Sequence, residues 1–188
     1  MKNNTLLCGI DEAGRGCLAG PMVVAGAVLH RDIPGLNDSK KLTAKKREAL
    51  FHAITQSASY HICVIEPESI DRRGITPVLT DALREIMATL EADSFLFDGN
   101  SSYGIAGLDH LIKADATVEA VAAASILAKV TKDRLLTEQG ASFPEFSFAS
   151  HQGYGTKKHI DEIKVHGYTP LHRRSYKLKA LIQPSLDL

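Results

Sequence analysis

Short apolar runs separated by polar and glycine-rich stretches are the main pattern along this chain. Four such runs occupy residues 6–10, 22–30, 60–66 and 94–98, and a weaker one covers residues 108–112. Runs of this length, bounded by turn-forming residues, are typical of buried β-strands, whereas helices need longer periodic segments. The pattern therefore predicts strands at these five places.

Longer segments with apolar residues every three or four positions predict helices. The first helix is expected to follow Thr43 as its N-cap. The second is expected to have Thr76 as N-cap and Pro77 at its first position, where proline is favoured. A later helix begins after Thr156 and ends at Gly167.

Residues 117–139 predict a further helix, which ends at Gly140. Its first half is apolar on nearly every face, so it is expected to be the central buried helix. Strands followed by mixed strands and helices favour an α/β fold with a central mixed β-sheet flanked by helices. The length of 188 residues is that of one domain, so residues 1–188 are predicted to form a single domain. Residues from about 140 to 188 would be its small helical C-terminal part.

Two adjacent carboxylates stand out in the segment Gly9-Ile10-Asp11-Glu12-Ala13-Gly14-Arg15-Gly16. They follow the first apolar run and lead directly into a glycine-rich loop. Carboxylates near the interior are costly unless they are paired or hold metal. A glycine-rich loop lets backbone N–H groups approach a polar ligand closely. The combination suggests phosphate chemistry, and a solvated acid pair at an ordinary strand–loop junction is the alternative interpretation.

Two further acids are candidates for the same place. Asp98 ends the fourth apolar run, so a parallel pairing of that strand with the first brings Asp11 and Asp98 to one sheet edge. Asp115 precedes the buried helix, near its positive N-terminal end. Together with Glu12 these acids balance two divalent cations, and oxygen-only ligands favour Mg²⁺ or Mn²⁺. Taken alone, Asp98 also fits a turn residue and Asp115 an ordinary helix acid.

The charge is balanced overall but unevenly distributed. The chain has 22 basic and 22 acidic residues, with basic residues gathered in 38–48 and 150–188 and acidic residues in 66–98. Such a chain can still present a basic face to phosphates, and mixed, solvated helix faces are the alternative. The odd cysteine count and the lack of a signal-peptide core predict a cytoplasmic protein. No apolar run approaches the roughly 18–20 residues that span a bilayer, so no membrane association is expected.

Four histidines, His151, His159, His166 and His172, lie in the C-terminal part. Their spacings match no zinc motif, so surface or backbone-capping roles are favoured over metal binding. Lys132, towards the end of the buried helix, is expected to complement the helix dipole or to extend its charge to solvent.

Five motifs in a fixed order give the chain a close resemblance to a known family. They are residues 9–16, the Asn-Asp-Ser-Lys-Lys-Leu stretch at 37–42, Phe97-Asp98-Gly99-Asn100, the alanine-rich stretch at 122–130, and His172-Arg173-Arg174-Ser175. The set resembles that of bacterial ribonuclease HII, the type 2 ribonuclease H family. The resemblance runs from about residue 6 to residue 178 and implies a ribonuclease H-like fold.

The resemblance also implies an activity. Enzymes of that family are metal-dependent endoribonucleases that hydrolyse the RNA strand of RNA–DNA hybrids. They also incise duplex DNA on the 5′ side of a single embedded ribonucleotide, leaving a 3′-hydroxyl and a 5′-phosphate. The implied cofactor is a pair of Mg²⁺ or Mn²⁺ ions. By position, the catalytic and metal-binding residues are Asp11, Glu12, Asp98 and Asp115.

Substrate-binding roles carry over by position in the same way, mostly into the glycine-rich loop and the C-terminal part. Gly14, Arg15 and Gly16 match the loop that reads the ribose 2′-hydroxyl, and Tyr154 matches the tyrosine that stacks at the RNA–DNA junction. The residues expected to contact backbone phosphates are Lys40, Lys41, Arg173 and Arg174.

The chain departs from the family pattern at three positions. Cys17 stands where proline is common, Ala114 where glycine is usual, and Tyr176 where phenylalanine is frequent. The second departure weakens the assignment of Asp115, but none removes a proposed metal ligand.

Two other functions compete with this interpretation. A DNA resolvase of the same fold would cut substrates that contain no ribose. A non-catalytic nucleic-acid-binding module would bind without metal-dependent cleavage. The expected assembly is a monomer. The C-terminal residues Gln183–Leu188 resemble the short peptides that bacterial sliding clamps accept, with a frayed terminus as the alternative.

Overall fold

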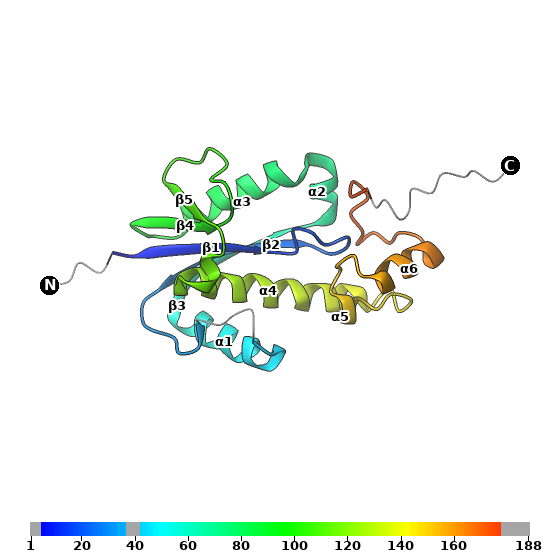
Figure 1. Ribbon diagram of the computed structural model, residues 1–188, viewed down its shortest axis with the longest axis horizontal. Helices are drawn as coiled ribbons and strands as arrows, with labels where there is room; N and C mark the ends of the chain where they lie inside the picture. The colour runs from blue at the N-terminus through cyan, green and yellow to red at the C-terminus, as the bar shows by residue number, and fades with distance from the viewer. Residues whose placement is uncertain (1–4, 37–41, 178–188) are drawn as a thin grey trace.

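The central sheet of the protein is mixed. The computed structural model describes residues 5–36 and 42–177, and in this part of the chain five strands pair in the order β3-β2-β1-β4-β5 (Figure 1). Strand β1 pairs antiparallel with β2 and parallel with β4, and the β4–β5 pair is also parallel. The strands are β1 (Leu7–Ala13), β2 (Met22–Leu29), β3 (Ala58–Ile65), β4 (Ser94–Asp98) and β5 (Leu108–Leu111).

Helices cover both faces of this sheet. Figure 1 shows α2 and α3 on one side, and α4 with α1 outside it on the other. Two short helices, α5 and α6, lie beyond one end of the sheet and form the C-terminal part. The bounds are α1 (Ala44–Ser57), α2 (Pro67–Arg73), α3 (Ile75–Thr89), α4 (Glu119–Gly140), α5 (Phe148–His151) and α6 (Lys157–His166), with a 3₁₀ turn η2 (Ala114–Ala116) before α4.

Three apolar clusters hold the layers together. One lies between the sheet and α3, and a second between the sheet and the alanine-rich half of α4. The third joins Leu136 near the end of α4 to Phe146, Phe148 and Ile163 of the C-terminal part. The helix α4 lies very close to β1, because a Cβ atom on Gly9 would be 2.2 Å from the backbone of Ala120.

The helix starts differ in part from the sequence prediction. Thr43 caps α1 as expected, with its hydroxyl accepting from the Lys46 N–H. Helix α3 begins at Ile75 with Gly74 as N-cap, so Thr76 is not the cap. Gly74 has a φ of 81°, a conformation that suits glycine and turns the chain from α2 into α3.

The buried helix α4 also begins two residues later than predicted. Residues 114–116 form the 3₁₀ turn η2, so Asp115 is separated from the first turn of α4. The buried character of the helix and its end at Gly140 are confirmed. No helix in the described ranges is long and apolar enough to cross a membrane.

Candidate metal centre and substrate pocket

Three aspartates from separate elements meet at one edge of the sheet. The parallel pairing of Ile10 with Phe97 puts Asp11 and Asp98 side by side, one position further along the two strands. The turn η2 adds Asp115, which follows β5. Carboxylate oxygens of the three residues all lie within 4.8 Å of one another. The parallel neighbours β1 and β4 therefore produce the convergence that their strand-end acids predict.

Two of the three aspartates are buried, and their surroundings are unfavourable for negative charge. Asp11 is 9% exposed and Asp115 is 2% exposed. Burial raises the pKa of Asp11 well above its ordinary value, and the charges of Glu12 and Asp98 raise it further. Burial likewise raises the pKa of Asp98. Several ionised carboxylates at this distance repel one another unless a cation lies between them.

Backbone hydrogen bonds orient these carboxylates. The Glu12 N–H donates to Asp11 Oδ1 at 2.7 Å. The two oxygens of Asp98 accept from the N–H groups of Lys113 at 2.9 Å and Asp115 at 3.3 Å. Backbone donors thus fix the directions of the Asp11 and Asp98 carboxylates.

Glu12 lies outside this three-aspartate group. Consecutive side chains of a strand point to opposite faces, so Glu12 cannot share the face of Asp11. Its Oε1 lies 3.6 Å from Arg15 Nη1. Its Oε2 is buried and has no hydrogen-bond partner within the described residues. Burial raises the pKa of Glu12, and the charge of Asp98 raises it further, whereas Arg15 lowers it.

The donor set fits hard divalent cations. Every candidate ligand is a carboxylate oxygen, and Mg²⁺ and Mn²⁺ prefer such ligands, whereas zinc favours nitrogen and sulfur. A bound cation would relieve the mutual repulsion within the cluster. It would also give the orphaned oxygen of Glu12 a partner. The residues present therefore suit the metal that the sequence motif implies.

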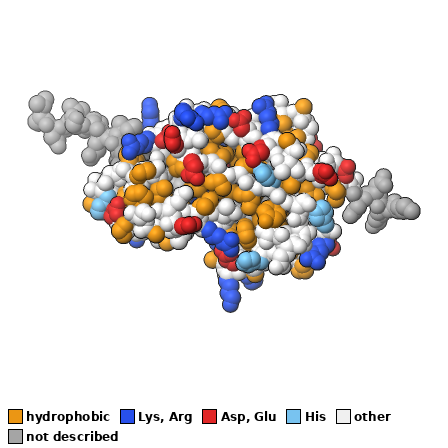
Figure 2. All heavy atoms as spheres, turned by 180° about the vertical axis from the view of Figure 1, so that it is seen from behind, with side chains coloured by type: hydrophobic (Ala, Val, Ile, Leu, Met, Phe, Trp, Pro, Cys, Tyr) orange, Lys and Arg blue, Asp and Glu red, His pale blue; other side chains and the backbone are white. Residues whose placement is uncertain are grey.

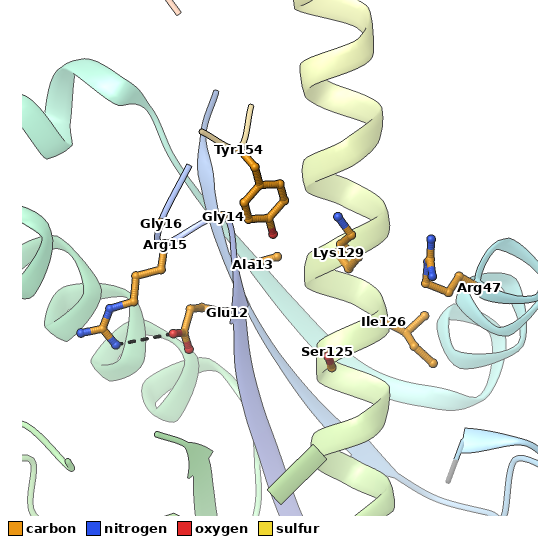
Figure 3. A pocket seen from close by; sticks show the side chains of 10 residues that line it. All are labelled: Glu12, Ala13, Gly14, Arg15, Gly16, Arg47, Ser125, Ile126, Lys129 and Tyr154. Carbon is orange, nitrogen blue, oxygen red and sulfur yellow. Dashed lines mark ion pairs between the residues drawn. The ribbon is translucent and has the colours of Figure 1, made fainter. Parts of the chain in front are cut away.

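A pocket of about 450 Å³ opens beside Glu12. The loop after β1, helix α4, Arg47 and Tyr154 form its walls, and Figure 3 shows the Tyr154 ring between the loop and Lys129. Arg47 and Lys129 bring positive charge to the wall opposite Glu12. The sequence analysis did not identify Arg47 or Lys129 as a site residue. The sequence feature that could have indicated them is the number of basic residues near each.

Glycine occupies positions 14 and 16 of the loop for different structural reasons. Gly14 has a φ of +86°, and a Cβ there would lie 2.8 Å from the Pro21 carbonyl oxygen. A Cβ on Gly16 would meet no atom within 4 Å. The fold therefore requires glycine at position 14, whereas position 16 leaves open space at the pocket wall.

Arg173 supports this loop from inside. Its side chain is 1% exposed, and the guanidinium donates to the carbonyl oxygens of Arg15 and Gly20. Tyr176 adds a second donor to the Arg15 carbonyl at 2.7 Å. The expectation that Arg173 contacts backbone phosphates is corrected here, because its donors face the interior of the protein. Arg174 is exposed, and its N–H donates to Asp71 of α2.

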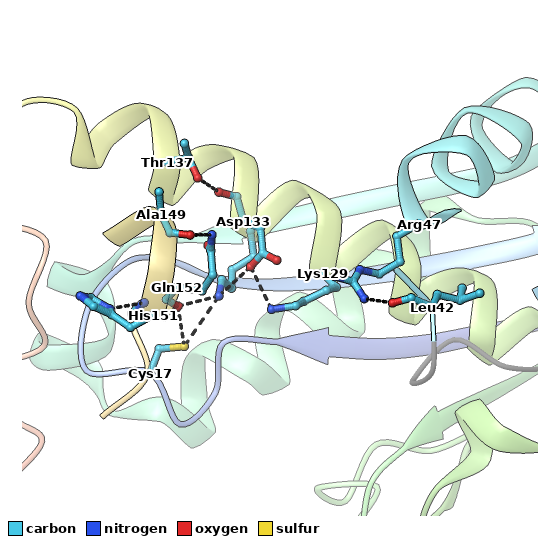
Figure 4. A network of polar contacts seen from close by, with 11 residues as sticks. Cys17, Leu42, Arg47, Lys129, Asp133, Thr137, Ala149, His151 and Gln152 are labelled. Atoms are coloured by element: carbon cyan, nitrogen blue, oxygen red, sulfur yellow. Dashed lines mark hydrogen bonds and ion pairs between the residues drawn. The ribbon is translucent and has the colours of Figure 1, made fainter. Parts of the chain in front are cut away.

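Lys132 is also an internal residue, not a solvent-directed one. It is fully buried, and its Nζ donates to the Gln152 carbonyl oxygen at 2.8 Å and lies 2.9 Å from Asp133 Oδ1. Figure 4 labels these two partners, Gln152 and Asp133. The same ammonium group lies 4.8 Å from the centre of the Tyr154 ring. Cys17, which replaces the common proline, contacts the Gln152 carbonyl through its thiol at 3.5 Å.

Three of the four C-terminal histidines are buried as well. His151, His159 and His172 are at most 6% exposed, so the surface interpretation is wrong for them, whereas His166 is exposed. Histidine spacing alone does not distinguish a buried cluster from scattered surface rings. The nearby aromatic residues Phe146 and Phe148, which pack on these rings, were the available signal.

The other predicted site residues fall into two groups. Tyr154 is 40% exposed and lines the pocket. Lys40, Lys41 and the tail Gln183–Leu188 lie outside the described residues. On the face in Figure 2, basic side chains are interspersed with acidic ones, so this face does not form a uniformly basic surface.

A mixed sheet that brings aspartates of neighbouring parallel strands together at one edge is typical of metal-dependent nucleases of the ribonuclease H-like class. Comparison with known proteins narrows this class. Residues 8–179 match the ribonuclease HII family, and the chain belongs to that family. It is therefore an endoribonuclease, and the expected fold and activity are confirmed.

Individual relatives agree along almost the whole chain. The ribonuclease HII of Aliarcobacter butzleri is 52% identical over 183 residues, which cover 96% of this chain and 94% of the relative. That of Sulfurovum sp. is 47% identical over 187 residues, covering 99% and 100%. Among solved structures, the PCNA:RNase HII complex from Archaeoglobus fulgidus contains a similar chain, with a TM-score of 0.80 and 29% identity over 96% of this chain and 98% of that one.

Proposed function

We propose that this chain hydrolyses the RNA strand of RNA–DNA hybrids and incises duplex DNA on the 5′ side of single embedded ribonucleotides. The products are a 3′-hydroxyl and a 5′-phosphate. The observation that carries the proposal is the convergence of Asp11, Asp98 and Asp115 next to a pocket lined by Gly14–Gly16 and Tyr154. One side of this arrangement suits phosphate chemistry, and the other suits recognition of a sugar.

The three aspartates and Glu12 are the residues that would hold divalent cations, with Mg²⁺ and Mn²⁺ as the proposed ions. When bound, such ions activate a water molecule and stabilise the leaving oxygen of an in-line displacement at phosphorus. The chain's own contribution is to hold the carboxylates in place through the backbone N–H groups of Glu12, Lys113 and Asp115.

The pocket residues divide the recognition of substrate between them. Open space beside Gly16 lets a ribose approach the backbone, where N–H and carbonyl groups can meet its 2′-hydroxyl. The 2′-hydroxyl is the group that distinguishes RNA from DNA. The half-exposed ring of Tyr154 suits stacking on the following deoxyribose. Arg47 and Lys129 suit backbone phosphates, because they bring positive charge to the same pocket.

One cleavage assay tests this function. Three duplexes of the same sequence are compared, with a single ribonucleotide, with one all-RNA strand, and with DNA only, each with Mg²⁺, with Mn²⁺ and with a chelator. We expect metal-dependent cleavage of the first two, and no cleavage of the DNA duplex. Cleavage of plain DNA would instead identify a resolvase, and binding without cleavage would identify a non-catalytic module.

A sliding clamp is the proposed protein partner. A clamp-bound relative is known from the PCNA:RNase HII complex of Archaeoglobus fulgidus. In this chain the proposed docking segment is Gln183–Leu188, which lies outside the described residues. Deletion of residues 183–188 should abolish clamp binding in a pull-down and leave cleavage rates unchanged. Absence of binding by the full-length chain would refute the proposal.

A further inference from the structure

Three buried histidines lie behind Tyr154, outside the catalytic pocket. The rings of His151 and His159 stack with their centroids 3.9 Å apart, and His172 lies next to His159. Phe146 and Phe148 pack on the group, and each residue of the triad is at most 6% exposed. Polar rings buried to this degree are destabilising unless their nitrogens are hydrogen-bonded.

The hydrogen-bond partners determine which nitrogen carries the proton in two of the rings. The Thr169 N–H donates to His172 Nδ1 at 2.9 Å, so in a neutral ring the proton of His172 is on Nε2. That Nε2 lies 3.0 Å from Nε2 of His159 and must donate to it. The proton of His159 is then on Nδ1, which donates to the Tyr154 carbonyl oxygen at 2.9 Å.

The third ring is determined in the same way. The Gly153 N–H donates to His151 Nδ1 at 3.2 Å. The proton of His151 is therefore on Nε2, which lies 3.0 Å from Glu162 Oε2 and donates to it. Every ring nitrogen of the three histidines thus has a partner, with one proton for each ring.

These bonds reach the backbone just before and just after the Cα atom of Tyr154, at the Gly153 N–H and at the Tyr154 carbonyl oxygen. We infer that His151, His159 and His172 are positioning residues for Tyr154, each neutral and each held in a single tautomer. The inference rests on the proposed function, in which Tyr154 stacks at the junction after a ribonucleotide. The histidines do not touch substrate; they fix the direction in which the ring is presented.

The segment that carries the ring is fixed at every carbonyl oxygen. Three consecutive carbonyl groups each accept a hydrogen bond from a different part of the chain. The Gln152 carbonyl oxygen accepts from Lys132 Nζ at 2.8 Å, and the Gly153 carbonyl oxygen accepts from the Leu18 N–H at 2.7 Å. The Tyr154 carbonyl oxygen accepts from His159 Nδ1 at 2.9 Å. The Tyr154 carbonyl oxygen also accepts from the Thr156 N–H at 2.8 Å. Removal of the His159 donor therefore takes away one of two bonds at this oxygen and loosens the end of the segment nearest the ring.

The surroundings of the cluster keep it uncharged. Burial lowers the pKa of all three histidines, in the case of His172 to about 4. Lys132 and Lys158 also lower the pKa of His151, and Arg174 lowers that of His172, whereas Glu162 raises the pKa of His151 and His159. A second proton on the His159–His172 pair would set two N–H groups against each other across 3.0 Å.

The first test measures the tautomers directly in the full-length protein. Long-range ¹H–¹⁵N spectra of histidine-labelled protein at pH 7.5 distinguish Nδ1–H, Nε2–H and doubly protonated rings, and histidine-to-glutamine variants assign the signals. We expect the Nε2–H form for His151 and His172 and the less common Nδ1–H form for His159. An Nε2–H or cationic His159 at this pH would overturn the inference.

The second test is a double-mutant cycle on two substrates, a duplex with a single ribonucleotide and a continuous RNA–DNA hybrid. His159→Phe keeps an aromatic ring but removes the donor to Tyr154. We expect this variant to lose more activity on the single ribonucleotide than on the continuous hybrid. The loss should not exceed the roughly 5- to 150-fold decrease expected for Tyr154→Ala, in which stacking is lost completely. In the Tyr154→Ala background, His159→Phe should change the substrate ratio no further.

Two control variants accompany this cycle. His159→Asn places an amide nitrogen near the position of Nδ1 and should restore most of the substrate ratio. His166→Phe, at an exposed histidine of the same helix, should behave as the wild type. If the wild type is active and folded His159→Phe loses the same activity on both substrates, the inference is overturned and the proposed function is not. An inactive wild type would refute the proposed function. The tautomer spectra can be measured whether or not the protein is active.

Discussion

At the scale of single residues, Gly14 and Gly16 belong to one motif but answer to different constraints. The backbone at Gly14 has positive φ and lies against Pro21, whereas Gly16 faces open space at the pocket. Substitution by alanine at each position therefore tests two different constraints. At Gly14 it tests the backbone conformation, and at Gly16 it tests the space left for a ligand.

We predict that Gly16→Ala leaves stability unchanged and lowers cleavage at a ribonucleotide at least tenfold, about 1.4 kcal/mol, because the added methyl group blocks the approach of the ribose. Gly14→Ala should instead destabilise the protein by roughly 1–2 kcal/mol or more, because of its φ value. Thermal unfolding and cleavage rates of both variants check this. Normal activity of Gly16→Ala would refute the proposed approach of the ribose.

The acids should show opposite effects on activity and stability. We predict that Asp11→Asn or Asp98→Asn lowers turnover by on the order of several kcal/mol, because a cation ligand is lost. The folded-state pKa of each residue is raised, so its ionised form destabilises the metal-free protein at neutral pH, and the neutral amide removes that cost.

Thermal unfolding in the presence of a chelator should therefore give a higher midpoint for these variants than for the wild type. Added Mg²⁺ should raise the wild-type midpoint by mass action and have a smaller effect on the variants. A lower midpoint in chelator together with full activity would contradict both parts of this prediction.

Sequence reasoning at this scale was strongest where one residue type has few uses. Aspartates at the ends of two apolar runs predicted the meeting of Asp11 and Asp98, since parallel neighbours end at one edge. The same reasoning did not separate Glu12 from the group, because the strand continues to Ala13 and alternates its side chains. Arg173 was misassigned because a basic motif does not reveal which of two arginines points inward.

At the scale of elements, the segment after α6 joins the loop of β1 to helix α2. Arg173 donates to the loop, while the Arg174 N–H and Ser175 donate to Asp71 of α2. Neighbouring arginines thus have different surroundings, one internal and one exposed. This difference gives a matched pair of variants.

We predict that Arg173→Ala lowers the free energy of unfolding by at least roughly 1–3 kcal/mol, because buried carbonyl groups lose their donor. Its salt dependence of substrate binding should stay that of the wild type. Arg174→Ala should keep the stability and make the slope of log affinity against log salt shallower by about 0.7–1. Binding titrations at several salt concentrations measure this. A shallower slope for Arg173→Ala would restore the original assignment of that residue.

The elements were predictable to the extent that their signals are local. The N-caps Thr43 and Thr156 and the apolar stripe of α4 identify helices without reference to the rest of the fold. Helices α2 and α5 were missed, because seven and four residues are too few for a periodic pattern. The start of α3 was misplaced because a glycine with positive φ serves as its cap.

At the scale of the whole molecule, protonation links stability to the histidine cluster. The folded-state pKa values of the three histidines lie below the usual value, so the unfolded chain binds more protons as the pH falls. Their contribution to stability is complete above about pH 6.5 and decreases as the pH falls towards the folded-state values. Asp11 acts in the opposite direction, since its pKa is raised in the metal-free protein.

We predict that Asp11→Asn protein loses stability between about pH 6.5 and pH 4 by up to about 1.4 kcal/mol per pH unit for each histidine that titrates. Adding His172→Gln should make this decrease shallower, because one depressed pKa is removed. Denaturant unfolding at half-unit pH steps measures both curves. Parallel curves for the two variants would show that His172 does not contribute.

The main-chain bonds between Leu18 and Gly153 have a consequence for the accuracy of cleavage. They tie the segment that carries Tyr154 to the loop after β1 through backbone atoms, in addition to the side-chain bonds from Lys132 and His159. In the proposed mechanism the loop meets the ribose and Tyr154 meets the following deoxyribose, so the cleaved phosphate lies between two parts of the chain that are bonded to each other. A substitution that leaves these backbone bonds intact should therefore change how fast a strand is cut more than it changes which bond is cut.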